Sequence, residues 1–293
     1  MVANMDAPGL DPQDLEQYCE RVGLSQRPDA DLAGLSAVQA AHQQGIGFEN
    51  LDIRLGRAIA IEGDAVFDKL VRRGRGGYCF EKNRLLGDVL TALGIPNRPL
   101  LARPLLRQVS PDGPLPARTH QCLLARIEGR DVVADAGFGG SIMPPMLLED
   151  GYEARAGDGA LYRLRRIGEG ASSPGEYLLE RQGAGPESEW QRQYALDLQP
   201  VAPADLAMAN HWTATRPGVR FTSLHIVSIG LPDGHAALTD RELSITRSAA
   251  TERRLIDEPE DYARTVRELF RIALTDAEAA ALPLFARTPV TAP

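Results

Sequence analysis

Apolar residues recur at helical spacing in the first hundred residues of the chain. The periodicity predicts helices over 14–22 and 32–42, and a third helix that begins near Cys79. Gly94 and Pro96 follow this third stretch, and a helix commonly ends with a glycine just beyond it and a proline soon after. The N-terminal part of the chain is therefore expected to be a helical bundle.

From about residue 97 the apolar positions form short runs separated by turn-forming segments such as SPDGPLP and GEGASSPG. Several such runs in succession predict an antiparallel barrel or sandwich. The predicted strands lie in PLLARPLL, HQCLLARI, RDVVADAGF, ALYRLRRI and EYLLERQ.

Beyond about residue 203 the pattern is mixed. Strand-like segments at 220–231 and 241–247 precede a predicted helix over 258–273. A further helix is predicted from Thr275, because Thr-x-x-Glu278 forms a capping box. The chain as a whole is expected to be an α+β protein whose three domains span residues 1–97, 98–203 and 204–293.

Composition and charge narrow the function. The chain carries 32 Lys+Arg against 40 Asp+Glu, a net charge of −8, with a pI near 5.3. Binding to nucleic acid or an anionic membrane depends on clustered basic residues, so neither is expected as a partner. No secretory signal or apolar run long enough to span a membrane is visible. A cytoplasmic protein that acts on small molecules is the expectation.

Cysteines and histidines are few. The three cysteines, Cys19, Cys79 and Cys122, are too sparse for a disulfide framework and suit a reducing compartment. Cys19 lies on the apolar face of the first predicted helix and is expected to be core. No CxxC or HxxxH pattern occurs, so no metal site is expected. The five histidines are scattered at positions 42, 120, 211, 225 and 235.

The segment RRGRGGYCFEKN, residues 72–83, places Cys79 at the start of a predicted helix. A helix N-terminus carries partial positive charge, so it stabilises a thiolate there. The preceding glycines, Gly76 and Gly77, let the backbone bend and leave room for a substrate. Cys79 is therefore a candidate nucleophile, although a cytosolic cysteine is more often a small buried hydrophobe.

A base and an orienting acid are predicted on a hairpin. If the strands HQCLLARI and RDVVADAGF join through a two-residue turn at Glu128-Gly129, Cys122 faces Asp135 and His120 lies on the same face as a diagonal neighbour. A three-residue loop would break this relation. An acid among apolar strand residues is costly to bury without a partner, which favours a His120–Asp135 pair.

These three residues suggest a cysteine triad. Asp135 would hold His120 in one tautomer, and His120 would take the proton of Cys79. Cys122 shares the face of His120 but has no helix N-terminus, so it is expected to be a neighbour of the site. The competing interpretation is a strand-end histidine and a turn aspartate with no joint role.

The motifs around the triad resemble those of the arylamine N-acetyltransferase family. RGGYCFE with Asn83 is similar to the family's nucleophile motif, and GIGFENLDI, residues 45–53, is similar to its Phe-Glu-Asn-Leu-Asp segment. Thr119-His120 and DAGFG from Asp135 match the other two triad segments, in the order Cys, His, Asp. The resemblance also includes LEQYCERVGL, Asn210-His211-Trp212 and Arg220-Phe221, so it covers nearly the whole chain.

This resemblance implies a helical bundle, a β-barrel domain and an α/β lid around a cysteine-protease-like Cys-His-Asp core. It also implies an enzyme of xenobiotic metabolism that transfers an acetyl group from acetyl-CoA, as co-substrate, to an arylamine, arylhydroxylamine or hydrazine. The reaction would be ping-pong, through a thioester on Cys79, without a bound cofactor. Oligomeric state and the preferred acyl chain are left open.

The resemblance also suggests roles for residues around the triad. The expected acceptor pocket is walled by Phe48, Tyr78, Phe80 and Phe221. CoA would contact Thr119, Gly137, Phe138, Gly139 and Trp212, with the glycine loop offering backbone N–H groups to an anion. A structural set of Glu49, Asn50 and Arg75 would brace the nucleophile segment.

The sequence departs from the family pattern at three positions. Gly47 stands where proline is usual, Lys82 where a neutral residue is commoner, and His211 between Asn210 and Trp212. None of them is a triad residue. A glycine in place of proline before Phe48 would loosen the acceptor pocket, so the preferred acceptor amine is left open.

Other functions share this triad. An amide synthase of the same family would join a polyketide chain to an aromatic amine, and a transglutaminase-like cysteine hydrolase would act on amides. A binding module with an inactive site is the non-enzymatic alternative.

Overall fold

The N-terminal part of the protein is a set of helices that carries one short strand. The computed structural model describes residues 9–106, 113–140, 142–168, 173–185, 188–248 and 250–285. Asp11 and Asp31 cap the first two helices, each accepting a backbone N–H three residues on. The helices are α1 (Pro12–Val22), α2 (Leu32–Gly45), α3 (Leu51–Arg54), α4 (Gly63–Phe67), the π-helical η1 (Asp68–Arg72) and α5 (Cys79–Ala92).

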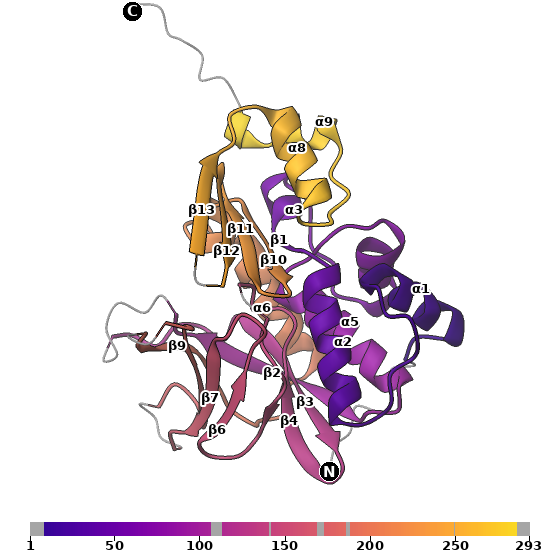
Figure 1. Ribbon diagram of the computed structural model, residues 1–293, viewed down its shortest axis with the longest axis vertical. Helices are drawn as coiled ribbons and strands as arrows, with labels where there is room; N and C mark the ends of the chain where they lie inside the picture. Colours follow the sequence, from indigo (N-terminus) through magenta and orange to yellow (C-terminus); the bar gives the residue numbers. More distant parts are fainter. Residues whose placement is uncertain are drawn as a thin grey trace, which may run out of the picture.

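An eight-stranded antiparallel sheet follows and curves into a nearly closed barrel (Figure 1). The strand order is β5-β4-β3-β2-β9-β8-β7-β6. The strands are β2 (Asn97–Pro104), β3 (His120–Ile127), β4 (Arg130–Ala134), β5 (Met146–Leu147), β6 (Tyr152–Arg155), β7 (Leu161–Arg166), β8 (Tyr177–Gln182) and β9 (Trp190–Leu196).

The C-terminal part contains a second antiparallel sheet of order β1-β10-β11-β12-β13. Its first strand, β1 (Phe48–Glu49), comes from the helical region, with Phe48 opposite Ser228. The first and last parts of the chain are therefore joined through one sheet. The other elements are α6 (Pro203–Thr215), α7 (Arg220–Ser223), β10 (Ile226–Leu231), β11 (Gly234–Thr239), β12 (Glu242–Arg247), β13 (Ala250–Leu255), α8 (Pro259–Glu268), α9 (Asp276–Ala281) and η2 (Pro283–Phe285).

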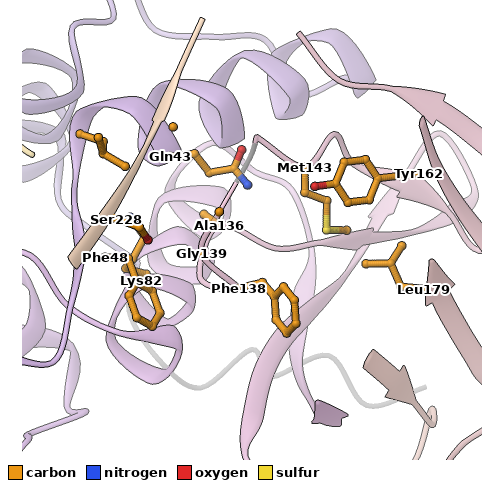
Figure 2. Close-up of a pocket in the computed structure, with 13 residues that line it drawn as sticks. Gln43, Phe48, Lys82, Ala136, Phe138, Gly139, Met143, Tyr162, Leu179 and Ser228 are labelled. Carbon is orange, nitrogen blue, oxygen red and sulfur yellow. The ribbon is translucent and has the colours of Figure 1, made fainter. Parts of the chain in front are cut away.

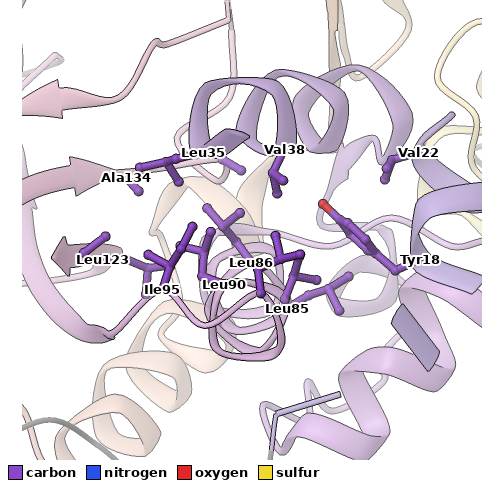
Figure 3. Packing of buried hydrophobic residues seen from close by; sticks show 14 of the residues in the cluster. Tyr18, Val22, Leu35, Val38, Leu85, Leu86, Leu90, Ile95, Leu123 and Ala134 are labelled. Atoms are coloured by element: carbon purple, nitrogen blue, oxygen red, sulfur yellow. The ribbon is translucent and has the colours of Figure 1, made fainter. Parts of the chain in front are cut away.

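The largest core lies between the N-terminal helices and the barrel (Figure 3). Leu85, Leu86 and Leu90 of α5 are fully buried in it, with Leu35 of α2 and Leu123 of β3. Burial of such side chains contributes about 1.5–3 kcal/mol each. This packing fixes α5 against β3, so the residue that begins α5 and the residue that begins β3 are held near each other.

The predicted architecture is confirmed, and the main differences are local. The helix predicted over 258–273 ends at Glu268, because the backbone turns at Arg271, where φ is 56°, and Ala273 N–H then donates to the Gly74 carbonyl. The strand-like segment 220–231 contains α7 before β10. Asp135 lies just past β4 rather than within a strand.

The apolar pattern did not predict helix α6, because its apolar residues do not gather on one face of the helix. Asn210 is buried, whereas Met208 and Trp212 are exposed. No helix within the described part of the chain is long and apolar enough to cross a membrane.

Candidate active site

Cys79 is the first residue of α5 and lines a cavity of about 490 Å³. Glu81, in the first turn, accepts the backbone N–H of Tyr78 at 3.1 Å and so caps the helix. The cysteine is 3% exposed, and its Sγ lies 3.7 Å from the Thr119 carbonyl. The nucleophile candidate is thus at a helix N-terminus, where the helix dipole favours an anion, and faces space for a ligand.

His120, the first residue of β3, lines the same cavity and forms a hydrogen bond with Asp135. The distance from His120 Nε2 to Asp135 Oδ2 is 2.7 Å. The hairpin turns through Glu128 and Gly129, both at positive φ, and Leu123 pairs with Ala134. This is the two-residue turn on which the prediction of a His120–Asp135 pair depended.

Buried polar groups hold Asp135 in place. Its Oδ1 accepts from Asn83 Nδ2 at 2.9 Å and from the Gly137 N–H at 2.8 Å. Its backbone is held by two glutamines of α2, since Asp135 N–H donates to Gln39 and its carbonyl accepts from Gln43, both at 2.9 Å. The sequence motif contained Asn83 but did not indicate its partner, and the glutamines had no signal.

The electrostatics favour a charged histidine. Burial lowers the pKa of His120, but the Asp135 charge and hydrogen bond, together with a hydrogen bond to Cys79, outweigh burial and raise it to about 10. Burial raises the pKa of Asp135, but the His120 charge and the bonds from His120 and Asn83 lower it overall. Because Nε2 faces the carboxylate, Nδ1 is the ring nitrogen left for the Cys79 thiol. The three side chains can therefore hold a thiolate–imidazolium pair next to a carboxylate.

The glycine loop differs from its expected role at Gly137. The Gly137 N–H donates to Asp135, so it does not point a free donor at an anion. A Cβ on Gly137 would come within 2.8 Å of Cys79 Cα, so glycine is needed here for close packing against the nucleophile. Gly137 itself lines the large cavity, together with Phe138 and Gly139, whose φ is 83°.

Two of the four predicted aromatic wall residues face the cavity. Phe48 and Phe221 line it, with ring centroids 5.9 Å apart. Tyr78 and Phe80 are fully buried and are not among its lining residues. Tyr78 packs edge-on against Phe221 at 5.7 Å and donates a hydrogen bond to Asn210. The expected set is corrected accordingly: Tyr78 supports the wall from behind through its contact with Phe221, and Phe80 packs against Tyr78 in turn, at 5.5 Å between ring centroids.

The cavity also contains residues from the barrel and the C-terminal sheet. Thr119 lines it, as does Trp212, which stacks under the Arg216 guanidinium at 3.9 Å. Sequence motifs did not indicate the polar residues at its barrel side, which come from distant strands. These residues are Arg181, Gln191 and Gln193, and His235 of β11 lines the cavity from the C-terminal sheet.

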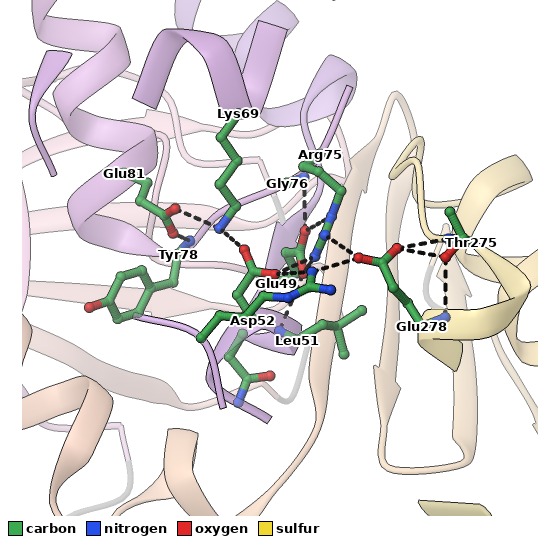
Figure 4. A network of polar contacts seen from close by, with 12 residues as sticks. Glu49, Leu51, Asp52, Lys69, Arg75, Gly76, Tyr78, Glu81, Thr275 and Glu278 are labelled. Atoms are coloured by element: carbon green, nitrogen blue, oxygen red, sulfur yellow. Dashed lines mark hydrogen bonds and ion pairs between the residues drawn. The ribbon is translucent and has the colours of Figure 1, made fainter. Parts of the chain in front are cut away.

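A network of buried ion pairs lies on the other side of the nucleophile segment (Figure 4). Arg75 binds Glu49 through two hydrogen bonds, of 3.0 and 2.9 Å, and also contacts Asp52 at 3.1 Å and Glu278 of α9 at 3.3 Å. Glu49 in turn accepts the Gly76 N–H at 3.0 Å. We call this set, with Lys69 and Glu81, the Arg75 network.

Lys69 completes the Arg75 network. Its ammonium lies 2.7 Å from both Asp52 and Glu81. Burial lowers the pKa of Lys69, but Glu81, Glu49 and Asp52 outweigh burial and raise it overall. Burial raises the pKa of Asp52, whereas Lys69 and Arg75 bring it down to about 2. Lys69 and Asp52 thus keep their charges across the ordinary pH range.

Asn50 has a separate structural contact. Its Nδ2 donates to the carbonyls of Phe221 and Leu224, and its Oδ1 accepts the Ile226 N–H, each at 2.7 Å. These bonds tie the start of α3 to the segment that carries Phe221. Asn50 therefore positions one cavity wall rather than joining the Arg75 network.

The remaining cysteines lie outside the cavity lining. Cys122 is fully buried in the barrel core, where burial raises the pKa of its thiol, and Cys19 is partly buried on α1. All three cysteines are free thiols. Within the described ranges no group of three or more His, Cys, Asp or Glu side chains is placed to hold a metal ion.

Comparison with known protein families identifies the class. A family model described as N-acetyltransferase matches residues 31–279, which include α2 to α8, both sheets and the first residues of α9. The matched segment contains every residue of the Cys79, His120 and Asp135 arrangement. The chain is an acyltransferase.

Individual relatives define the family. The chain is 37% identical over 267 residues to arylamine N-acetyltransferase from Mycolicibacterium smegmatis, covering 90% of this chain and 93% of the relative. A solved structure of the M. smegmatis enzyme has a TM-score of 0.84 at 35% identity and covers 94% and 98% of the two chains. The M. marinum enzyme, solved in complex with CoA, has a TM-score of 0.82 at 30% identity, covering 92% and 98%.

This chain belongs to the arylamine N-acetyltransferase family. The family, the α+β fold and the enzyme class predicted from the sequence are confirmed. The three domain boundaries and the roles of individual site residues remain predictions.

Proposed function

We propose that this chain transfers an acetyl group from acetyl-CoA to the nitrogen of an arylamine, arylhydroxylamine or hydrazine through an acetyl-Cys79 intermediate. Arylamine N-acetyltransferase activity is that of the family to which the chain belongs. One observation supports the assignment of steps to residues. Cys79 begins α5 and opens onto the 490 Å³ cavity beside His120, which is hydrogen-bonded to Asp135.

In the first half-reaction the Cys79 thiolate attacks the thioester carbonyl carbon. A new carbon–sulfur bond forms to Cys79, and the bond to the CoA sulfur breaks. The departing CoA thiolate takes the proton that His120 holds. Asp135 keeps the imidazole in one orientation and stabilises its positive charge. The N-terminal N–H groups of α5 favour the negative charge that develops at the carbonyl oxygen.

In the second half-reaction the acceptor amine attacks the acetyl-Cys79 carbonyl. A carbon–nitrogen bond forms, the bond to Cys79 breaks, and His120 takes the proton that the amine loses. Phe48 and Phe221 offer an apolar, aromatic wall to the acceptor. Thr119, Gly137, Phe138, Gly139 and Trp212 also line the cavity and are proposed to contact CoA.

Mass spectrometry with acetyl-CoA alone tests the proposal. Wild-type protein should gain the mass of one acetyl group, and peptide mapping should place it on Cys79. Adding an arylamine should then remove the label and yield the N-acetyl product. The acceptor range is best defined with a panel of arylamines and hydrazides against several acyl-CoAs.

Matched cysteine variants define the nucleophile. Cys79→Ser should take no acetyl group through a thioester, whereas Cys122→Ser should still be acetylated. A wild-type protein that gains no acetyl group, or one that is labelled on Cys122, would contradict the proposal. Hydrolysis of a glutamine amide without CoA would assign the site to the hydrolase class instead.

The proposed setting follows from the same chemistry. Acetyl-CoA is a co-substrate and small amines are the partners, with no resident cofactor proposed. We infer a cytoplasmic location, where free thiols such as those of the three cysteines persist.

A further inference from the structure

The sequence contains two lysines, Lys69 and Lys82, and both are buried. Lys69 is compensated by two carboxylates in the Arg75 network. Lys82 lies on α5 three residues after Cys79, is 2% exposed, and donates to the Ile46 carbonyl. Among the residues with described positions, no carboxylate forms an ion pair with it. Lys82 is therefore a buried cation whose nearest hydrogen-bond partner is neutral.

The surroundings of Lys82 contain one more cation and one relevant anion. Arg21 donates to the Gly45 carbonyl at 2.6 Å, next to the Ile46 carbonyl that Lys82 binds. Arg21 therefore opposes the Lys82 charge, while Asp135 favours it. The ionisable groups on the elements packed around Lys82 are Tyr18 and Arg21 of α1, His42 of α2, Cys79 and Glu81 of α5, His120 of β3, and Asp135.

Lys82 also lines a small cavity (Figure 2). Its volume is about 20 Å³, and it is lined by Lys82, Gln43, Phe48, Phe138 and Gly139 among others. A space of this size holds about one water molecule, so solvent does not screen the ammonium as it would at a surface. Gln43, on the same cavity, also donates to the Asp135 carbonyl. Gln43 thus links the cavity that Lys82 lines to the backbone of Asp135.

We propose that Lys82 is a positioning residue whose buried positive charge stabilises the Asp135 carboxylate and the Cys79 thiolate. The inference rests on the proposed function, because it assigns Lys82 a part in preparing the nucleophile. It also gives a reason for a cation at a position where the family more commonly has a neutral residue.

The charge on Lys82 depends on pH. Burial and Arg21 lower the pKa of Lys82, and despite the opposing effect of Asp135 it is about 7. Lys82 is therefore charged below about pH 7 and neutral above it. A positive charge lowers the pKa of nearby acids. His120, whose pKa is about 10, loses its proton at a pH where Lys82 is already neutral.

Nuclear magnetic resonance tests the charge state directly. Protein labelled with ¹³C-lysine gives signals from two residues, which Lys69→Met and Lys82→Met assign. The Lys82 Cε signal should titrate near pH 7, while Lys69 stays charged. In Asp135→Asn the Lys82 midpoint should fall, since its favouring anion is lost and the coupling is reciprocal. A Lys82 titration midpoint that does not respond to Asp135→Asn would overturn the inference.

Alkylation of Cys79 by iodoacetamide, quantified by peptide mapping across pH, tests the effect on the nucleophile. The rate of Cys79 alkylation should fall at acid pH. In Lys82→Gln the pH at which half of this rate is lost (the acid-side midpoint) should rise by about one pH unit, the usual effect of one nearby charge. The change in alkylation rate at alkaline pH, where His120 loses its proton, should stay at the same pH, because Lys82 is already neutral there. Glutamine keeps a donor for the Ile46 carbonyl, so this variant removes charge rather than the hydrogen bond. Lys82→Arg keeps the charge and should retain the wild-type midpoint.

The outcomes separate charge from structure. An unchanged acid-side midpoint in folded Lys82→Gln would contradict the inference, as would an equal shift of both ionisations. If Lys82→Gln does not fold, the Asp135→Asn titration still decides. Alkylation needs no acetyl-CoA, so protein that alkylates as expected but gains no acetyl group refutes the proposed function and leaves the Lys82 coupling standing.

Discussion

The nucleophile segment has buried charges on both of its sides, and the two sets differ in how completely they are matched. In the Arg75 network each cation contacts at least two carboxylates, and Glu49 also accepts a backbone N–H. The second set consists of Cys79, His120, Asp135 and Lys82, and we call it the Cys79 set. In it the carboxylate of Asp135 faces an imidazole, and Lys82 has a backbone carbonyl as its partner. The Arg75 network, in which each cation has carboxylate partners, is the matched set and is suited to holding the backbone. The Cys79 set is the unmatched set, and its side chains can gain or lose protons during a reaction.

This contrast shows why burial alone does not identify a reactive group. Glu81 and Asp135 are both fully or almost fully buried carboxylates on or beside α5. Glu81 binds the ammonium of Lys69 and caps the helix. Asp135 binds a histidine that lines the 490 Å³ cavity. The two carboxylates differ in their partners. The partner of Asp135, His120, can release a proton near pH 10 and lines a cavity that can hold a substrate, whereas the partner of Glu81, Lys69, stays charged.

The largest effect should come from breaking the unmatched set at Asp135. Asp135→Asn should lower the rate of acetyl-Cys79 formation by about 10³–10⁴-fold, because the amide no longer stabilises imidazolium or selects its tautomer. The fold should survive, since the new side chain has nearly the same shape. Rapid-quench mass spectrometry measures the rate, and an unchanged rate would remove Asp135 from the proposed triad.

Breaking the matched set should cost stability. Arg75→Met leaves Glu49 and Asp52 buried without their guanidinium, so the free energy of unfolding should fall by about 3–5 kcal/mol. Arg73→Met is a matched control, because Arg73 is 60% exposed and pairs with the exposed Asp68. It should change the free energy by about 0.5 kcal/mol or less. Urea unfolding measures both, and equal losses would contradict the distinction.

The two buried lysines, Lys69 and Lys82, should differ in how their replacement changes the pH dependence of the free energy of unfolding. The pKa of Lys82 is about 7 in the folded protein and about 10.4 when unfolded, so the unfolded state binds more protons between these values and wild-type stability rises with pH. The stability of Lys82→Met relative to wild type should therefore be highest below pH 7. It should fall by up to about 1.4 kcal/mol per pH unit above pH 7.

Urea unfolding at pH 6, 7.5 and 9 follows this difference, and taking variant minus wild type cancels the titrating groups that do not interact with Lys82. Lys69→Met should instead lose stability at all three pH values, because it leaves the buried Glu81 without its ammonium partner and removes one of the cations that contact Asp52. A pH-independent difference for Lys82→Met would show that Lys82 keeps an ordinary pKa.

The smallest effect is expected at the rim of the Arg75 network. Glu278 is 18% exposed and pairs with the half-exposed Arg57 at 2.6 Å, where solvent weakens the interaction. Glu278→Gln retains an acceptor for the Thr275 N–H and so preserves the cap of α9. The expected loss is about 1 kcal/mol or less by thermal unfolding. A loss as large as that of Arg75→Met would place Glu278 among the essential charges.

Local patterns in the sequence predicted much of the fold and the core of the site. The start of the helix at Cys79 and the Glu128-Gly129 turn depend on a few neighbouring residues. The turn sets the register of β3 and β4, and the register places His120 and Asp135 on one face. Such features are decided by short-range backbone geometry, which neighbouring side chains specify.

Long-range packing accounts for what the patterns missed. Gln39 and Gln43 reach Asp135 from about a hundred residues away, and Glu278 reaches Arg75 from the other end of the chain. No spacing rule connects such positions. Gly137 shows the same limit, because its N–H could be assigned to Asp135 rather than to an anion only after the loop was placed against Cys79.

The sequence by itself therefore determined that a cysteine begins a helix and that a histidine and an aspartate share one face of a hairpin. It also determined the α+β order of elements, because periodicity and turn residues act over a few positions. Only the tertiary structure decided that Tyr78 and Phe80 stand behind the cavity wall and that one buried lysine is paired and the other is not. Burial and charge compensation depend on which distant elements pack together.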